Sequence, residues 1–133
     1  LISLGALQYV PHHIPVAEAR QAMAEADGLL IMDRFGSNGI LQVPAKVFEY
    51  IQIGRPILAF TNPGSPVASI LSTSGVRHVC VYLNDSPELQ DKKFLEFLNL
   101  STDPVEPTEE YQRKFGAYEQ TQLLAGVFDS VLQ

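Results

Sequence analysis

The segment from residue 36 to residue 54 combines a loop of small residues, a lysine and a glutamate in a pattern that suits ligand binding. Lys46 and Glu49 are three positions apart, so they share one side of a helix. In open α/β sheets, ligands bind at loops and helix starts of this kind, because backbone N–H groups there can hold an anion. The simpler alternatives are an ordinary surface loop and an exposed Lys46–Glu49 ion pair. The small-residue loop consists of Gly36, Ser37, Asn38, Gly39 and Ile40.

The helix that carries these two charged side chains is predicted at residues 44–53. Pro44 is tolerated at a first helical position, because its missing N–H would have no partner there. Val47 and Ile51 form an apolar pair one turn apart, and Gly54 is placed to end the helix in a left-handed conformation. The apolar run that follows, at 56–60, predicts a buried parallel strand.

Strands and helices alternate along the rest of the chain. Further strands are expected at 1–7, 28–33 and 78–83. Further helices are expected at 15–26, from the turn at 61–65 through residue 72 with Gly75 as the stop, from 87 onward, and at 109–133. A proline-containing connector at 101–108 separates the last two helices. This alternation predicts an α/β fold: a doubly wound parallel sheet with helices on both faces and right-handed crossovers. The final helix carries an apolar stripe, and we expect it to pack partly on something outside this chain; the stripe comprises Leu124, Val127, Phe128 and Val131.

The composition fits one domain over residues 1–133. A net charge of −6 without a Lys/Arg cluster argues against nucleic acid or an anionic membrane as a partner. Cys80 is the one cysteine, so it forms no internal disulfide, and its apolar neighbours favour a small buried hydrophobe. No apolar run approaches the ~18 residues of a membrane span and no signal peptide is evident, so we expect a cytoplasmic location. Because the chain begins at Leu1 rather than methionine, we expect a piece of a longer protein.

Two parts of the sequence together resemble a known family. The first comprises Tyr9-Val-Pro-His12 and the run from Glu18 to Ile31, and the second is Val43-Pro-Ala-Lys-Val-Phe-Glu-Tyr-Ile-Gln-Ile-Gly-Arg-Pro-Ile-Leu58. In this order, they resemble the C-terminal, donor-binding domain of GT-B fold glycosyltransferases, in the family called group 1 or family 4. The resemblance runs from about residue 4 to residue 83, and more loosely to the end. It implies a Rossmann-like sheet that forms the C-terminal half of a GT-B fold, with the N-terminal acceptor domain absent from this chain.

The resemblance also implies a nucleotide-sugar site. Glu49 matches the family's glutamate that hydrogen-bonds the ribose hydroxyls, and a carboxylate can accept from both hydroxyls of a diol. The loop at 36–40 and the start of the next helix would face the diphosphate. Lys46 would reach a phosphate or pair with Glu49, and both interpretations stay open. His12 would contact the ligand, or be a surface or structural histidine. Asp33, at the end of a strand, is a weaker candidate for a contact with the donor sugar.

By the same resemblance, the whole protein would transfer a sugar from a nucleoside-diphosphate donor to an acceptor hydroxyl. No cofactor beyond this substrate and no protein-held metal is implied, and the catalytic base would lie in the absent domain. We therefore expect the chain alone to be inactive. The sequence departs from the family at Leu41, where many members carry a glutamate that holds the sugar. Two alternatives remain: half of a GT-B-like nucleotide-sugar epimerase, and a non-catalytic α/β interaction module.

Overall fold

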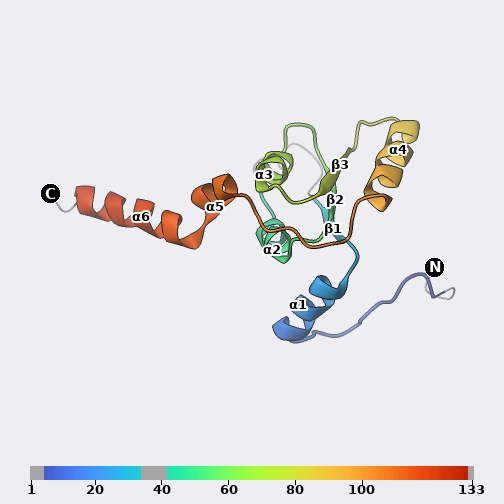
Figure 1. Cartoon of the computed structure of the whole chain (residues 1–133), viewed down its shortest axis with the longest axis horizontal. Coiled ribbons are helices and arrows are strands. Elements are labelled where there is room, and N and C mark those ends of the chain that lie inside the picture. The colour runs from blue at the N-terminus through green and yellow to red at the C-terminus, as the bar shows by residue number, and fades with distance from the viewer. Residues whose placement is uncertain (1–4, 34–41, 132–133) are drawn as a thin grey trace.

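Three short parallel strands form the centre of the molecule (Figure 1). The computed structural model describes residues 5–33 and 42–131. Strand β1 (Leu29–Met32) pairs with β2 (Ile57–Thr61), and β2 pairs with β3 (His78–Tyr82), so the strand order is β1-β2-β3. The expected α/β fold with a parallel, Rossmann-like sheet is confirmed.

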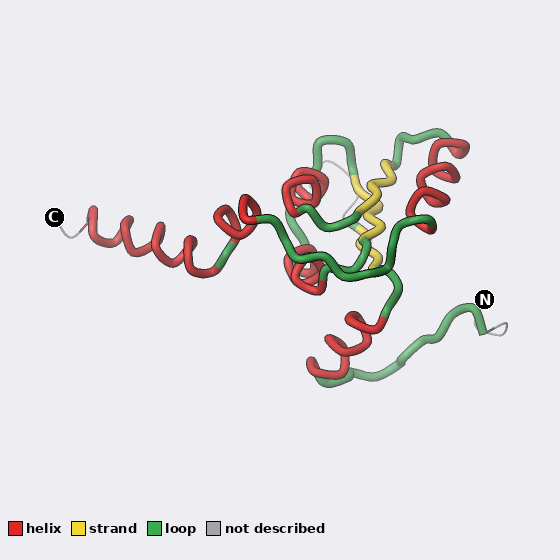
Figure 2. Tube along the Cα trace, viewed as in Figure 1, coloured by secondary structure: helices red, strands yellow, loops and turns green. Residues whose placement is uncertain are grey.

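Helices cover both faces of this sheet. Helices α2 (Lys46–Ile53) and α3 (Pro66–Ser74) lie on one face, and α4 (Pro87–Leu98) lies on the other. The remaining helices are α1 (Val16–Glu25), α5 (Glu109–Phe115) and α6 (Ala117–Val131). Helix α1 packs beside α2 and α5 packs beside α3, whereas α6 extends away from the sheet (Figures 1 and 2).

The main core lies between the sheet and helices α2 and α3. Val47 and Ile51 of α2 are fully buried, as their spacing predicts, and so is Leu71 of α3. Burying each such side chain stabilises the fold by about 1.5–3 kcal/mol. A smaller cluster on the opposite face packs under α4 and comprises Leu58, Val79 and Val81, with Phe60, Phe97 and Leu100 against them.

Local sequence signals set several helix ends where they were expected. Gly54 ends α2 at φ 78° and ψ 1°, and Gly75 ends α3 at φ 75°, both in the left-handed region. Ser65 caps α3 by accepting a hydrogen bond from the Val67 amide (3.2 Å). Ser86 caps α4 by accepting a hydrogen bond from the Leu89 amide (3.3 Å). These caps keep the helix starts at the carboxyl ends of β2 and β3.

The connector at 101–108 has no regular secondary structure and crosses beneath the sheet from α4 to α5 (Figure 2). Two backbone hydrogen bonds fasten it to the ends of other helices: Val105 N–H donates to Gly54 O (3.0 Å) and Thr108 N–H to Ser74 O (2.9 Å). The carbonyl of Thr102 also accepts from the guanidinium of Arg55 (2.6 Å). The connector is therefore an integral layer of the fold.

The structure corrects the expectations at both ends of the chain. Residues 5–7 of the expected strand at 1–7 form a turn and a loop, and Gly5 has φ 70°, outside the range of regular strands; residues 1–4 lie outside the described residues. The single helix expected at 109–133 is two helices. Gly116 separates them because it is extended, with φ −67° and ψ 141°.

Two central elements also differ from expectation. The strand at β1 is buried on one side only, because α4 covers β2 and β3 and leaves Leu30 and Met32 exposed. Helix α2 begins at Lys46 rather than at Pro44. Its first turn is tight: the Val47 amide donates to Pro44 O (3.0 Å), three positions back.

Candidate functional site

Lys46 and Glu49 lie on the first turn of α2, which follows β1 and its carboxyl end. The ends of parallel strands and the helix starts that follow them form the usual ligand-binding edge of an open α/β sheet. The loop predicted to complete this site lies outside the described residues, as does the departure at Leu41; its members are Gly36, Ser37, Asn38, Gly39 and Ile40.

Glu49 is held by an arginine from another helix. The Nε of Arg20, on α1, donates a hydrogen bond to Oε1 of Glu49 at 3.2 Å, across 29 positions of sequence. The Arg20 side chain is 66% exposed and that of Glu49 is 37% exposed. An ion pair this exposed contributes only about 0–1 kcal/mol to stability. Its main effect is to orient the Glu49 carboxylate toward α1.

A hollow of about 590 Å³ opens beside this ion pair. Arg20 and Glu49 contribute charged groups to its wall, Phe48 contributes an aromatic ring and Gln52 an amide; Ile53 completes the lining. An aromatic face next to an acceptor carboxylate and a cationic guanidinium suits a ligand with an apolar or planar part, hydroxyl groups and negative charge. The volume lies in the range of small-molecule sites.

Lys46 belongs to a different hollow. Its side chain lines a space of about 300 Å³ together with Leu30, Ile31, Met32 and Pro44. Among the described residues, the ion pair anticipated between Lys46 and Glu49 does not form, since Glu49 pairs with Arg20. Lys46 is exposed at the start of α2. The two residues therefore share a helical turn but face separate hollows.

His12 lies apart from these residues. It is exposed, in the loop that precedes α1. Figure 1 shows this loop on the far side of α1 from helix α2 and the sheet. The structure thus brings Glu49 together with Arg20 and leaves His12 separate.

Asp33 is part of a buried polar network. One oxygen of its carboxylate, Oδ2, accepts hydrogen bonds from the hydroxyls of Thr61 and Ser65, each at 2.7 Å. All three residues are at most 3% exposed. Asp33 therefore ties the end of β1 to the end of β2 and to the cap of α3, and its burial argues against a direct sugar contact. The sequence offered only one hint of this network: a carboxylate directly after an apolar run.

A second polar cluster lies beside β3. The Nζ of Lys93 contacts Oδ2 of Asp85 at 2.5 Å and lies 4.4 Å from the ring centre of Tyr82. A hollow of about 330 Å³ next to it is lined by Cys80, His78 and Lys93, among others. Burial raises the pKa of the Cys80 thiol despite the nearby Lys93 charge. The thiol is therefore a poor nucleophile, in agreement with its expected packing role.

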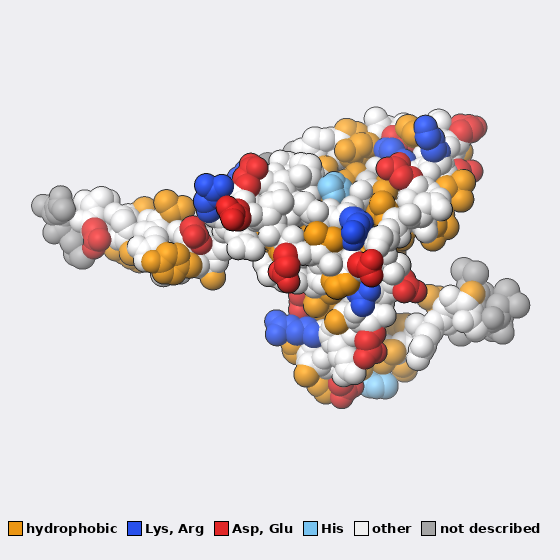
Figure 3. Space-filling model, in the orientation of Figure 1, with side chains coloured by type: hydrophobic (Ala, Val, Ile, Leu, Met, Phe, Trp, Pro, Cys, Tyr) orange, Lys and Arg blue, Asp and Glu red, His pale blue; other side chains and the backbone are white. Residues whose placement is uncertain are grey.

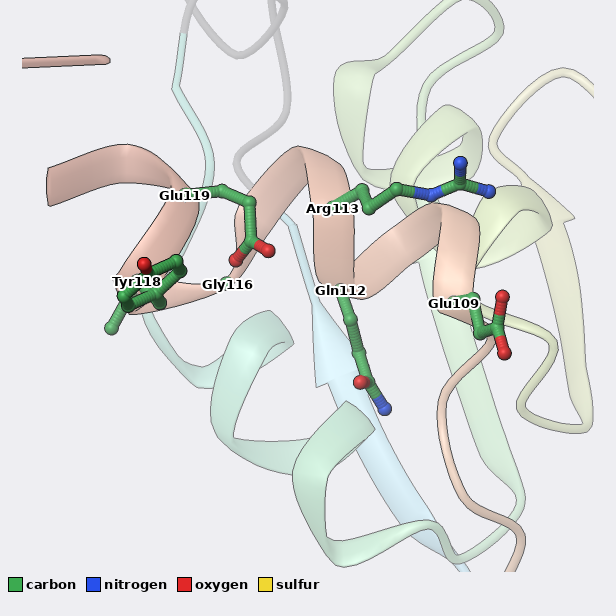
Figure 4. Close-up of a pocket in the computed structure, with 7 residues that line it drawn as sticks. Glu109, Gln112, Arg113, Gly116, Tyr118 and Glu119 are labelled. Carbon is green, nitrogen blue, oxygen red and sulfur yellow. The ribbon is translucent and has the colours of Figure 1, made fainter. Parts of the chain in front are cut away.

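A further hollow, of about 380 Å³, lies at the junction of α5 and α6 (Figure 4). Its polar side chains point in different directions: Arg113 extends away from Glu119, and Gln112 points toward α2. Groups that do not converge cannot hold one ligand, so we assign no site there.

The described residues contain no group of three or more His, Cys, Asp or Glu side chains arranged to bind a metal ion. In the same part of the chain, no helix combines the length and apolar character needed to cross a membrane. Comparison with models of known families, with curated proteins and with solved structures produced no match for this chain.

Proposed function

We propose that this chain is the donor-binding domain of a glycosyltransferase that uses a nucleoside-diphosphate sugar. The observation that carries the proposal is the position of Glu49 on the first turn of α2, the helix that follows β1, beside a hollow of about 590 Å³. The resemblance of residues 43–58 to the family's ribose-binding segment supports the same assignment.

Glu49 is the proposed ribose ligand. Its carboxylate accepts hydrogen bonds from the two ribose hydroxyls, each worth about 1.5–3 kcal/mol because one partner is charged. The exposed Arg20–Glu49 pair is worth about 0–1 kcal/mol. A ribose can therefore share or displace this pair at small cost, while Arg20 keeps the carboxylate oriented before binding.

Lys46 and the start of α2 are the proposed partners of the diphosphate. Backbone N–H groups at the first turn of a helix have no intrahelical partner, and the helix dipole places about half a positive charge there. Lys46 adds a full positive charge at the first residue of α2. By the resemblance, residues 36–40 complete the ligand contacts, whereas His12 lies apart from Lys46 and Glu49 and is not included.

In this mechanism, the chain stabilises the leaving diphosphate while the sugar passes to an acceptor hydroxyl. Fixed N–H groups and Lys46 act on the negative charge that develops as the glycosidic bond to phosphate breaks. The acceptor site and the base come from an N-terminal domain of the same protein, and closure of the two domains excludes water. The chain alone then binds the donor without transferring the sugar.

A non-catalytic interaction module is the second candidate, and the apolar surface of α6 favours it. Leu124, Val127, Phe128 and Val131 are all more than half exposed, and Figure 3 shows hydrophobic side chains along this helix. An interaction module would need this surface and would have no use for a nucleotide.

The test is a titration of the labelled chain with UDP, GDP, ADP and dTDP, followed by amide shifts in NMR spectra. We expect one nucleotide to shift the amides of Lys46, Glu49 and Gln52. Glu49→Gln should weaken its binding by about 10- to 150-fold, the equivalent of one charge-assisted hydrogen bond. Glu110→Gln, at an exposed glutamate of α5, is the matched control and should leave binding unchanged. Binding that is insensitive to Glu49→Gln, or the absence of any response, would contradict the proposal.

A further inference from the structure

Arg55 follows directly after the glycine that ends α2, and its guanidinium binds two other segments of the chain. Its Nε and one terminal nitrogen, Nη2, both donate to the carbonyl of Ala24 on α1, at 2.9 Å and 2.6 Å. The other terminal nitrogen, Nη1, donates to the carbonyl of Thr102 in the connector at 2.6 Å. The planar guanidinium suits these contacts because its donors have a fixed geometry. Arg55 therefore fastens the end of α1 both to the end of α2 and to the connector.

Helix α1 depends on this contact for its position. None of its residues is buried, and Met23 packs only partly buried against the main core. The helix ends at Glu25, so the carbonyl of Ala24 has no amide donor one turn further along α1. Arg55 supplies donors to that carbonyl. Because α1 buries so little apolar surface, loss of the Arg55 contact should free it to move away from α2.

The same side of α1 carries Arg20, the partner of Glu49. Arg20 precedes Ala24 by four positions, so the two lie one helical turn, about 6 Å, apart along the axis. The Nε of Arg20 donates to Oε1 of Glu49 at 3.2 Å. Together with the contact at Ala24, this hydrogen bond holds α1 against α2 at two points, and two points fix the direction of a helix where one would let it pivot. The Arg20–Glu49 pair is exposed and weak by itself, so we expect it to depend on Arg55.

We propose that Arg55 is a positioning residue for the nucleotide site at Glu49. By holding the end of α1, it keeps Arg20 beside Glu49 and so keeps the carboxylate oriented in the wall of the hollow of about 590 Å³. Arg55 is not among the residues that line this hollow, so it acts through Arg20 rather than on the ligand. The inference rests on the proposed function, because the ligand concerned is the nucleotide that Glu49 is proposed to bind.

Hydrogen exchange of the chain without nucleotide tests the contact between Arg55 and α1. Arg55→Met removes every donor, and we expect the amides of α1 to exchange about tenfold faster while those of β2 exchange as in the wild type. Arg77→Met is the matched control, because Arg77 also donates to a connector carbonyl, that of Asp103, at 2.7 Å. It removes the same charge and should leave exchange in α1 unchanged. No increase at α1 in Arg55→Met, or an equal increase in both variants, overturns the proposal.

Nucleotide affinity tests the positioning role. With the nucleotide that binds the wild type best among UDP, GDP, ADP and dTDP, Arg55→Met should weaken binding about 2- to 5-fold, as expected for Arg20→Ala. In the Arg20→Ala background, Arg55→Met should cause no further loss, because its effect passes through Arg20. Arg77→Met should leave the affinity unchanged. A loss that persists in the Arg20→Ala background, or one that Arg77→Met reproduces, overturns the positioning role.

The two measurements distinguish failure of this inference from failure of the proposed function. If α1 exchanges faster in Arg55→Met but the wild type binds no nucleotide, the proposed function fails and the positioning role fails with it. If the wild type binds a nucleotide through Glu49 and Arg55→Met leaves its affinity unchanged, the proposed function stands and the role of Arg55 is overturned.

Discussion

The hydroxyl of Thr61 donates a hydrogen bond of 2.7 Å to the carboxylate of Asp33, and this contact joins the carboxyl ends of β1 and β2. Both side chains are almost fully buried. A buried carboxylate is stable only with hydrogen-bond donors around it, and Ser65 supplies another from the cap of α3. The network therefore fixes the edge of the sheet at which the candidate site lies.

Removing one donor from this network should destabilise the fold. Thr61→Val keeps the shape of the side chain and deletes the hydroxyl, which leaves the Asp33 carboxylate with one donor fewer in a buried environment. We expect a loss of about 1–3 kcal/mol in the free energy of unfolding, measured by urea denaturation. Thr102→Val, at an exposed position in the connector, should change it by less than about 0.5 kcal/mol. Equal effects of the two substitutions would contradict the structural role of the network.

Gly54 and Gly64 have nearly the same φ but different surroundings. Replacing each of them by alanine therefore distinguishes the cost of backbone strain from the cost of a steric clash. Gly54 has φ 78°, and a Cβ there would lie 2.5 Å from the Val105 carbonyl oxygen; Gly64 has φ 77° and open space around it. Gly64→Ala should cost about 1–2 kcal/mol, from left-handed strain alone. Gly54→Ala should cost about 1–3 kcal/mol more, because the connector must move. Thermal unfolding of both variants measures the difference between the two losses of stability. Equal losses would contradict the prediction, because they would show that the connector moves away from the added Cβ without cost.

Acid should weaken the contact between Asp85 and Lys93. The hydrogen bond from Lys93 lowers the pKa of Asp85, the Tyr82 amide lowers it further, and desolvation opposes both. A lowered folded-state pKa contributes stability that is present above the ordinary value of 3.8 and is lost as the pH falls through the folded-state pKa.

The measurement is the free energy of unfolding of the wild type and of Asp85→Asn, at neutral pH and at a pH below 3.8. We expect the wild type to be more stable than Asp85→Asn at neutral pH, and we expect this difference in the free energy of unfolding to shrink at the lower pH. Lys93→Met removes the main cause of the lowered pKa of Asp85. In the Lys93→Met background, Asp85→Asn should therefore change the free energy of unfolding by an amount that depends much less on pH. A wild-type advantage that is constant with pH would contradict the assigned role of Lys93.

Arg20 should act on nucleotide binding through Glu49 and hardly at all on stability. The ion pair is exposed, so Arg20→Ala should change the free energy of unfolding by less than about 1 kcal/mol. Loss of the oriented carboxylate should weaken nucleotide binding by about 2- to 5-fold, the equivalent of that same energy. Isothermal titration calorimetry measures the affinity, with Arg113→Ala on α5 as the control. If Arg20→Ala weakened binding as much as Glu49→Gln, Arg20 would itself be a ligand-contacting residue.

Much of the fold was predictable from short stretches of sequence. The ends of α2 and α3 follow from Gly54 and Gly75, whose backbone angles suit a left-handed cap, and Ser65 starts α3 by binding a nearby amide. These signals act within a few residues, so one sequence contains all the information they need. The same reasoning placed Val47 and Ile51 in the core.

The partners of the charged side chains depended on the tertiary structure. Lys46 was the nearest candidate partner for Glu49 in sequence, yet Arg20 forms the ion pair, because packing of α1 beside α2 brings together residues 29 positions apart. Asp33 likewise acquired its donors from β2 and α3. Sequence by itself determined where α2 and α3 end and which residues of α2 face the core, because caps and apolar spacing are local. Which polar groups meet, and which apolar faces stay exposed, was decided only by how those elements pack.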